Sequence, residues 1–153
     1  VSVEEMRRVV QSSSELSLLA LDVGDKWVGV AHSDPSCTIA YPGDVLVRSK
    51  KNGGDEAVRG SLKSAIAEKR ACGMVVGWPI EMSGVEGKQC AKVFGFLQRM
   101  DIKLPVALVD ERLTSKVVED FLRHTHIKKP RQKRAVVDNM AATYILQNYL
   151  ATL

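Results

Sequence analysis

The segment from Leu16 to Val23 limits the fold more than any other part of this chain. It is strongly apolar and contains no turn residue. A run of this kind predicts a strand that is buried on both faces, so other elements must cover the sheet from both sides. A turn at Gly24-Asp25-Lys26 follows, and the next run, from Trp27 to Asp34, completes a predicted hairpin.

The rest of the chain changes from strand patterns to an alternation of strands and helices. Further strands are expected at 39–47, 74–77 and 104–109, and helices at 55–70, after the capping-box pattern at 83–86, after Thr114 and from about 136 onward. The first three strands would form an antiparallel meander. The order β-β-β-α-β-α-β-α-α therefore predicts an α/β fold, with a mixed five-stranded sheet and helices on both faces.

Apolar residues at helical spacing indicate which face of each helix meets the core. They are Val58, Leu62, Ala65 and Ile66 in the first expected helix, Cys90, Val93, Leu97 and Met100 in the second, and Ala141, Ala142, Ile145 and Tyr149 in the last.

The length of 153 residues is close to the commonest size of a single domain. Hydrophobic residues make up 45% of the chain, which is enough for a core. We expect residues 1–15, which are polar, to form an N-terminal arm with at most one helical turn. Residues 16–153 are expected to form one domain.

Neither a membrane span nor a disulfide framework is expected. No apolar run approaches the roughly 18 residues that cross a bilayer, and the first residues do not have the pattern of a signal peptide. The three cysteines lie at no metal-site spacing, which indicates structural thiols in a reducing compartment. We expect a cytoplasmic protein, or an organellar one if a presequence has been removed. Monomer and homodimer both stay open.

The strongest local concentration of charge is the block from Lys128 to Arg134. It holds five basic residues and no acid, in a chain whose net charge is +4. Such a block attracts polyanions, although a solvated loop is the alternative interpretation. Aromatic residues make up only 5%, so contact with a phosphate backbone is favoured over stacking on bases. We expect an exposed loop that borders the site, with Lys128, Lys129, Arg131, Lys133 and Arg134 contacting nucleic acid.

Acidic residues stand where several expected elements begin or end. Asp22 closes the first strand, Asp110 and Glu111 close the last, and Asp138 opens the final helix. Each alone is an ordinary strand-end or helix-start acid, and a helix dipole favours Asp138 without any metal. Together they suggest a shared site, because ligands bind beyond the carboxyl ends of parallel strands. Carboxylates bind hard cations such as Mg²⁺ or Mn²⁺, and such ions can serve phosphodiester hydrolysis.

Only one acid of the neighbouring pair Asp110 and Glu111 can face that site, because adjacent side chains of a strand point to opposite faces. We favour Glu111 as the metal ligand. Asp110 is the alternate ligand, and otherwise it would pair with Arg112 or cap the next element.

The glycines around the segment 77–87 bring a strand end and an expected helix start close together. Free backbone N–H groups at such a junction can accept a phosphate, although a plain, well-capped connection explains the pattern equally well. Lys88 and Arg112 are candidates for steadying the scissile phosphate.

In combination these motifs resemble the YqgF-like family of Holliday-junction resolvases, which are also described as pre-16S rRNA nucleases. The matching stretches, in the order of the family, are 21–26 with 29–31 and 33–34, then 76–79 with 84–87, then Asp110-Glu111-Arg112-Leu113-Thr114, then Val137-Asp138-Asn139-Met140-Ala141-Ala142. They cover roughly residues 18–150. Two departures stand out: Trp27 replaces the usual Arg, and Glu81-Met82-Ser83-Gly84 replaces the usual Asn-Met-Asp-Gly.

The resemblance implies an RNase H-like fold and metal-dependent nuclease chemistry with acids at Asp22, Glu111 and Asp138. The expected function is hydrolysis of structured nucleic acid, either precursor rRNA or branched DNA. One alternative is a binding module on the same fold that does not cleave. A second is an actin-like or sugar-kinase-like ATPase, but such proteins need two lobes, and the P-loop pattern is absent from the sequence.

Overall fold

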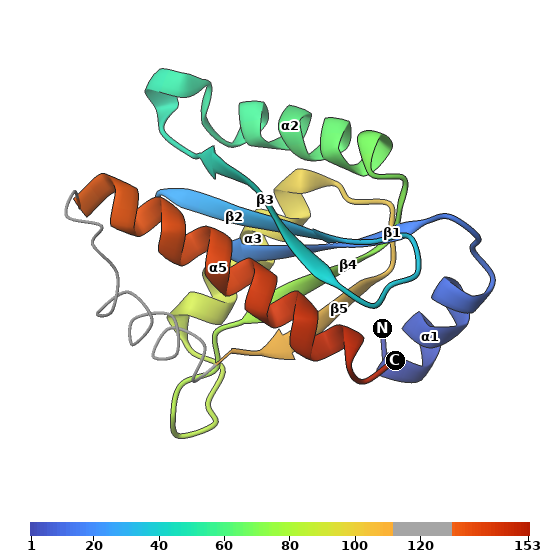
Figure 1. The fold of residues 1–153 in the computed structure, drawn as a ribbon. Helices are drawn as coiled ribbons and strands as arrows, with labels where there is room; N and C mark the ends of the chain where they lie inside the picture. The colour runs from blue at the N-terminus through green and yellow to red at the C-terminus, as the bar shows by residue number, and fades with distance from the viewer. Residues whose placement is uncertain (112–129) are drawn as a thin grey trace.

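The computed structural model describes residues 1–111 and 130–153, including their side chains except those of 130–138. The strands are β1 (Ser17–Val23), β2 (Trp27–Ser33), β3 (Ala40–Val47), β4 (Ala71–Trp78) and β5 (Val106–Asp110). The described helices are α1 (Val3–Gln11), α2 (Gly54–Glu68), α3 (Lys88–Met100) and α5 (Pro130–Leu150), with a 3-10 turn, η1, at Lys50–Asn52. The strands form one sheet in the order β3-β2-β1-β4-β5 (Figure 1).

The sheet is mixed, as the sequence predicts. Strand β1 pairs antiparallel with β2, and β2 pairs antiparallel with β3, so the meander is confirmed. Strand β1 also pairs parallel with β4, which pairs parallel with β5. All four residues from Leu18 to Leu21 are fully buried, as expected for a central strand covered on both faces.

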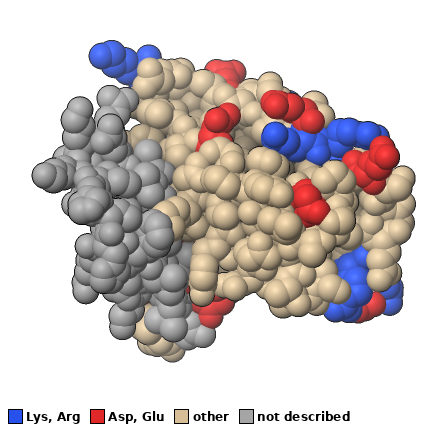
Figure 2. Space-filling view, viewed as in Figure 1, with Lys and Arg blue, Asp and Glu red and all other residues tan. Residues whose placement is uncertain are grey.

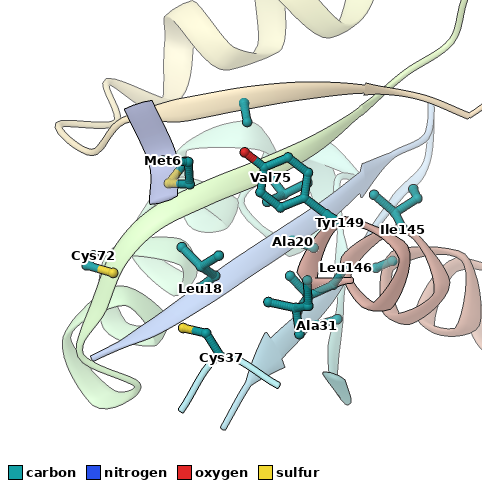
Figure 3. Close-up of a cluster of buried hydrophobic side chains, with 13 residues drawn as sticks. Met6, Leu18, Ala20, Ala31, Cys37, Cys72, Val75, Ile145, Leu146 and Tyr149 are labelled. Atoms are coloured by element: carbon teal, nitrogen blue, oxygen red, sulfur yellow. The ribbon is translucent and has the colours of Figure 1, made fainter. Parts of the chain in front are cut away.

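Helices cover both faces of the sheet. Helix α5 crosses one face diagonally, and α2 and α3 lie on the other (Figure 1). The alternation of side chains along β1 separates the two cores, because Leu18 and Ala20 pack on the α5 side, whereas Leu19 and Leu21 pack on the α2 and α3 side. Figure 3 shows the α5-side core, in which Ile145 and Tyr149 of α5 lie over the strands.

The predicted apolar stripes agree with the buried faces of the helices. The predicted residues that are buried are Val58, Leu62, Cys90, Val93, Met100, Ala141, Ala142, Ile145 and Tyr149. Helix α3 differs in one position: Phe96 is fully buried, whereas Leu97 is only partly buried. In α2, the predicted Ala65 and Ile66 are likewise only partly buried.

The N-terminal segment is more ordered than the sequence interpretation allowed. Helix α1 has nine residues instead of one turn, and Ser2 and Glu5 form a complete capping box at its start. Its single buried side chain, Met6, is fully enclosed and reaches Gly73 of β4 and Leu18 of β1. Val3, Met6, Val9 and Val10 stand at helical spacing, and Val9 and Val10 pack partly buried against the same core, so the helical signal was present and the sequence interpretation overlooked it.

Two other helix boundaries differ from the predictions. Helix α3 begins at Lys88 with Gly87 as its N-cap and no side-chain cap, so the expected capping box at 83–86 is wrong. Helix α5 begins at Pro130. Proline suits the first turn of a helix, because the N–H that it lacks would have no partner within the helix there. Asp138 therefore stands eight residues inside α5 and does not open it. The helix expected after Thr114 lies outside the described residues.

The outer edge of the sheet at β3 is bonded to side chains of α5. The amide N–H of Ala40 donates to Gln147 Oε1 at 2.9 Å, and Gln147 Nε2 donates to the carbonyl of Thr38 at 3.0 Å. The side chain of Asn139 donates to the carbonyl of Gly43. These bonds fix α5 to the edge strand and occupy backbone groups that would otherwise face solvent.

Within the described residues, no helix is both long enough and apolar enough to cross a membrane. Helix α5 has 21 residues, but it includes Arg131, Lys133, Arg134 and Asp138. Such charges are costly inside a bilayer.

We predict that Met6→Ala destabilises the protein by about 2 to 5 kcal/mol, because it removes a fully buried side chain from the α5-side core. Urea unfolding followed by circular dichroism measures the change. The matched control is Met82→Ala, since Met82 is 69% exposed and its loss should alter stability by less than about 0.5 kcal/mol. Equal stability of the Met6→Ala variant and the parent would mean that α1 is not part of the core.

Candidate active site

Three parallel strands end at the same edge of the sheet. Because β1, β4 and β5 run in the same direction, Asp22, Trp78 and Asp110 reach this edge together. Trp78 pairs with Asp110, and the N–H of Glu111 donates to the carbonyl of Trp78 at 3.3 Å. This bond continues the pairing of β4 and β5 by one residue, so Glu111 follows the strand geometry although it lies just beyond β5.

The alternation of side chains decides which acids share a face. Asp22 follows Leu18 and Ala20 at two-residue spacing, which places it on the α5 side of the sheet. Glu111 follows Ala107 and Val109 in the same way, and both of these pack in the α5-side core. Asp110 belongs to the opposite face, and it is exposed.

The space above Gly77 of β4 shows where the Glu111 side chain lies. A Cβ atom at Gly77 would collide with Glu111 Oε2 and would lie 2.9 Å from Glu111 Cδ. It would also lie 2.9 Å from Ile145 Cδ1 of α5. The carboxyl group of Glu111 therefore lies directly over β4, between the strand and α5.

Asp22 and Glu111 lie close enough for their carboxyl groups to share a proton. Burial, followed by the charge of Asp22, a hydrogen bond with Asp22 and the charge of Asp110, raises the pKa of Glu111 to about 8. A hydrogen bond between two carboxyl groups needs one proton, since two carboxylates only accept. When both carboxyl groups are ionised, their negative charges repel one another, so a positive charge placed beside both would be favourable.

Comparison with known proteins identifies the chain. A family model described as RuvX, Holliday junction resolvase, matches residues 16–152. The chain belongs to this family. A relative from Rickettsia bellii is 36% identical over 138 residues, covering 89% of this chain and 86% of the relative. Another, from Caldanaerobacter subterraneus, is 41% identical and covers 88% of this chain and 96% of the relative. Both are named as candidate pre-16S rRNA nucleases.

The fold of this RuvX-family protein also has solved counterparts. RuvC from Thermus thermophilus, solved in complex with a Holliday junction substrate, aligns with a TM-score of 0.53. The alignment covers 89% of this chain and 94% of that chain at 13% sequence identity, a level that establishes the fold alone. The predicted RNase H-like fold is confirmed.

Asp138, the third predicted acid of this RuvX-family protein, is located only by its backbone. It lies within α5, and its side chain is not among those that the structure describes. Among the described side chains, no three His, Cys, Asp or Glu groups gather closely enough to hold a metal ion. The roles of Asp22, Glu111 and Asp138 as metal ligands therefore stay predictions.

The predicted basic residues are divided between described and undescribed segments. Arg112, Lys128 and Lys129 lie outside the described residues. Arg131, Lys133 and Arg134 belong to the first turns of α5, so the expectation of a loop through 134 is wrong for this part. Lys88 is exposed at the first position of α3. On the face viewed in Figure 2, basic side chains of the described residues form separate groups, and acids lie beside those at the right of the view.

Further acids lie near the same edge, and the sequence interpretation gave them no role in the site. The carboxyl group of Glu81 lies over Gly87, the N-cap of α3. Burial raises the pKa of Cys90, and the charges of Glu86, Glu111 and Glu81 add to this effect, so these acids lie near one buried thiol. The change from the usual Asn of the family to Glu81 was the visible signal of this added charge.

Helix α3 also approaches this edge. Lys92 Nζ lies 3.4 Å from Asp25 Oδ1 in the turn between β1 and β2. A groove of about 800 Å³ lies elsewhere, between α2 and β3, where Leu19, His32 and Ser61 contribute to its walls. This groove is separate from the carboxyl pair, which lies on the opposite face of the sheet.

We predict that Glu111→Gln stabilises the metal-free protein at pH 8 to 9. Glu111 has a pKa of about 8 when folded and an ordinary value near 4.5 when unfolded. Its contribution to stability is therefore complete below pH 4.5 and is lost as the pH rises through 8. A neutral amide removes this loss of stability, which amounts to several kcal/mol at about 1.4 kcal/mol per pKa unit.

Urea unfolding in EDTA at pH 4, 6 and 8.5 tests this expectation. The parent and the Glu111→Gln variant should differ most at pH 8.5 and least at pH 4. The exposed Glu56, whose side chain is 84% accessible, provides the control, and Glu56→Gln should have no comparable pH dependence. A constant difference between parent and Glu111→Gln at all three pH values would contradict the proximity of the two carboxyl groups.

Proposed function

We propose that this RuvX-family protein is a metal-dependent endonuclease that hydrolyses phosphodiester bonds in structured nucleic acid. The observation that carries this proposal is the convergence of Asp22 and Glu111 at the carboxyl ends of parallel strands. Family membership, the nuclease names of the relatives and the RuvC-like fold all support nuclease function.

The chemistry of the carboxyl pair fits a hard divalent cation. Asp22 and Glu111 supply oxygen ligands, which Mg²⁺ and Mn²⁺ prefer, and the pair has excess negative charge when both groups are ionised. Binding of a cation would displace the shared proton, because ligand carboxylates must be deprotonated. When bound, such ions activate water and stabilise the leaving oxygen. We propose a two-ion site in which Asp22 and Glu111 would hold the ions.

Asp138 is proposed as the ligand that completes this set. It stands seven residues before Ile145, and positions seven apart lie on the same face of a helix. Ile145 packs above Gly77, beside the Glu111 carboxyl group. Asn139, the next residue, bonds to the carbonyl of Gly43 and so fixes the height of this part of α5 over the sheet.

The remaining predicted residues are proposed to hold the substrate. Lys88 and Arg112 would contact the scissile phosphate. Lys128, Lys129, Arg131, Lys133 and Arg134 would contact the phosphate backbone on either side, without reading the bases. The chain would thus recognise the shape and charge of its substrate more than its sequence.

Precursor rRNA is our first candidate substrate, because relatives that align over most of their length with this chain are named for it. Branched DNA is the second, because the family description and the RuvC complex name the Holliday junction. The departures at Trp27 and Ser83 leave Asp22 and Glu111 in place. A binding module without cleavage is the alternative that an activity assay must exclude.

We predict that Asp22→Asn lowers the cleavage rate by about 100-fold or more, because the amide keeps the shape of the side chain and removes the charge that binds the cation. Cleavage of a labelled precursor rRNA fragment and of a four-way DNA junction is followed in Mn²⁺ and in excess EDTA. Folding, measured by circular dichroism, and substrate affinity should change little.

Asp25→Asn is the matched control, since Asp25 is exposed three residues further along and pairs with Lys92. Its cleavage rate should stay within about twofold of the parent. Full activity of the Asp22→Asn variant, or equal cleavage in EDTA, would rule out the proposed chemistry. Binding without cleavage of either substrate by the parent would favour the binding-module alternative.

We predict that replacing Lys128, Lys129, Arg131 and Lys133 together with Ala weakens binding to all sequences to a similar extent. Neutralisation of a phosphate releases counterions, so the dependence of log affinity on log salt should become shallower by about 0.9 for each duplex phosphate that the variant no longer neutralises. Fluorescence anisotropy between 50 and 200 mM KCl measures this slope. An unchanged slope would mean that the block does not bind the backbone.

A further inference from the structure

Gly77 lies between the two strands that carry the paired acids. Leu21 of β1 pairs with Val76, and Val109 of β5 pairs with Gly77, so β4 separates Asp22 from Glu111. Val75, two residues earlier, packs in the α5-side core. The missing side chain of Gly77 would therefore point to the α5 side, the side on which both carboxyl groups lie.

The backbone conformation does not explain why this residue is glycine. Left-handed φ angles occur at Gly53, Gly54 and Gly84, but Gly77 is not among the residues with positive φ. The constraint is space. A Cβ atom would lie 2.9 Å from both Glu111 Cδ and Ile145 Cδ1, closer than such atoms approach in proteins, and it would be closer still to Glu111 Oε2. The Glu111 carboxyl group occupies the volume that any other side chain would fill.

We infer that Gly77 is a positioning residue, whose lack of a side chain lets the Glu111 carboxyl group lie over β4 beside Asp22. Its consequence for metal binding rests on the proposed function. A methyl group at this position would meet the end of a flexible side chain, so the carboxyl group can rotate away at small cost to the fold. The cost falls on the site, because Glu111 then no longer faces Asp22.

Gly73 provides a matched control in the same strand and on the same face. A Cβ atom there would lie 2.6 Å from Met6 Sδ and 3.0 Å from Leu18 Cδ2, and these are atoms of the apolar core. Gly73→Ala should therefore lower the melting temperature without changing the site. Gly77→Ala should instead lower the stability only slightly, and it should move the Glu111 carboxyl group away from Asp22.

The experiment compares the parent with Gly77→Ala, Gly73→Ala and the double variant Gly77→Ala with Ile145→Val. Three quantities are measured: the melting temperature, the Mn²⁺ affinity by calorimetry, and the pKa of Glu111 by ¹³C NMR without metal. For Gly77→Ala we expect at least a tenfold loss of Mn²⁺ affinity and a Glu111 pKa that returns toward its ordinary value. Gly73→Ala should keep the parent values of both.

The double variant separates a positioning role from a packing role. Ile145→Val removes Cδ1, which is the packing contact of the new methyl group, and leaves the contact with Glu111. The melting temperature should recover while the Mn²⁺ affinity stays low. Recovery of the affinity together with stability would overturn the inference, as would a Gly77→Ala variant with parental Mn²⁺ affinity and a raised Glu111 pKa.

Two further outcomes keep the inference separate from the proposed function. If the parent binds no Mn²⁺, the proposed function fails, and the pKa of Glu111 in the Gly77→Ala variant still decides the role of Gly77. If Gly77→Ala does not fold, adding Glu111→Ala removes the atoms that the methyl group meets most closely and should restore folding. Continued failure to fold would overturn the inference.

Discussion

The parallel pairing of β1 with β4 and of β4 with β5 is the constraint on which the rest of this molecule depends. It brings three carboxyl ends of strands to one edge and sets the register in which Asp22 and Glu111 meet. Register cannot slip here, because β1 is buried on both faces and a shift by one residue would exchange its two sets of side chains. Asp22 would then turn toward α2 and α3, and the pair with Glu111 would be lost. The apolar core therefore fixes the geometry of the polar site.

Periodicity predicted those parts of the fold in which burial repeats along the chain. The meander, the two parallel strands and the apolar stripe of α5 all follow from residues that are buried at regular spacing. Local signals were less dependable. Ser83 and Glu86 have the spacing of a capping box, but α3 begins only at Lys88, and Pro130 resembles a loop residue although it starts α5. Such signals are permissive, since the same residues suit a turn or a helix end, and tertiary packing decides between them.

The same distinction holds for the candidate site: some of its features could be predicted from the sequence, and others could be seen only in the fold. Strand alternation predicted that only one of Asp110 and Glu111 shares a face with Asp22, because that rule needs only neighbouring residues. The fold shows which one, because Ala107 and Val109 pack on the α5 side and Glu111 follows them. The place of Gly77 could not be predicted, since the atoms that fill its missing side chain come from Glu111 and from Ile145, each far away in the chain. Glu81 over Gly87 is a second example. A glycine that leaves room for a distant carboxyl group looks in the sequence like any turn glycine.

The bonds between α5 and β3 have a consequence for how copies of this chain behave at high concentration. An exposed edge strand is a template on which another strand can add, and the resulting ladder is a common route to aggregation. Here the amide of Ala40 and the carbonyls of Thr38 and Gly43 are already bonded to Gln147 and Asn139. Pro42 in the same strand has no N–H to offer. A second molecule that added a strand along residues 38–43 would first have to break these bonds, so α5 protects this part of the sheet edge from self-assembly.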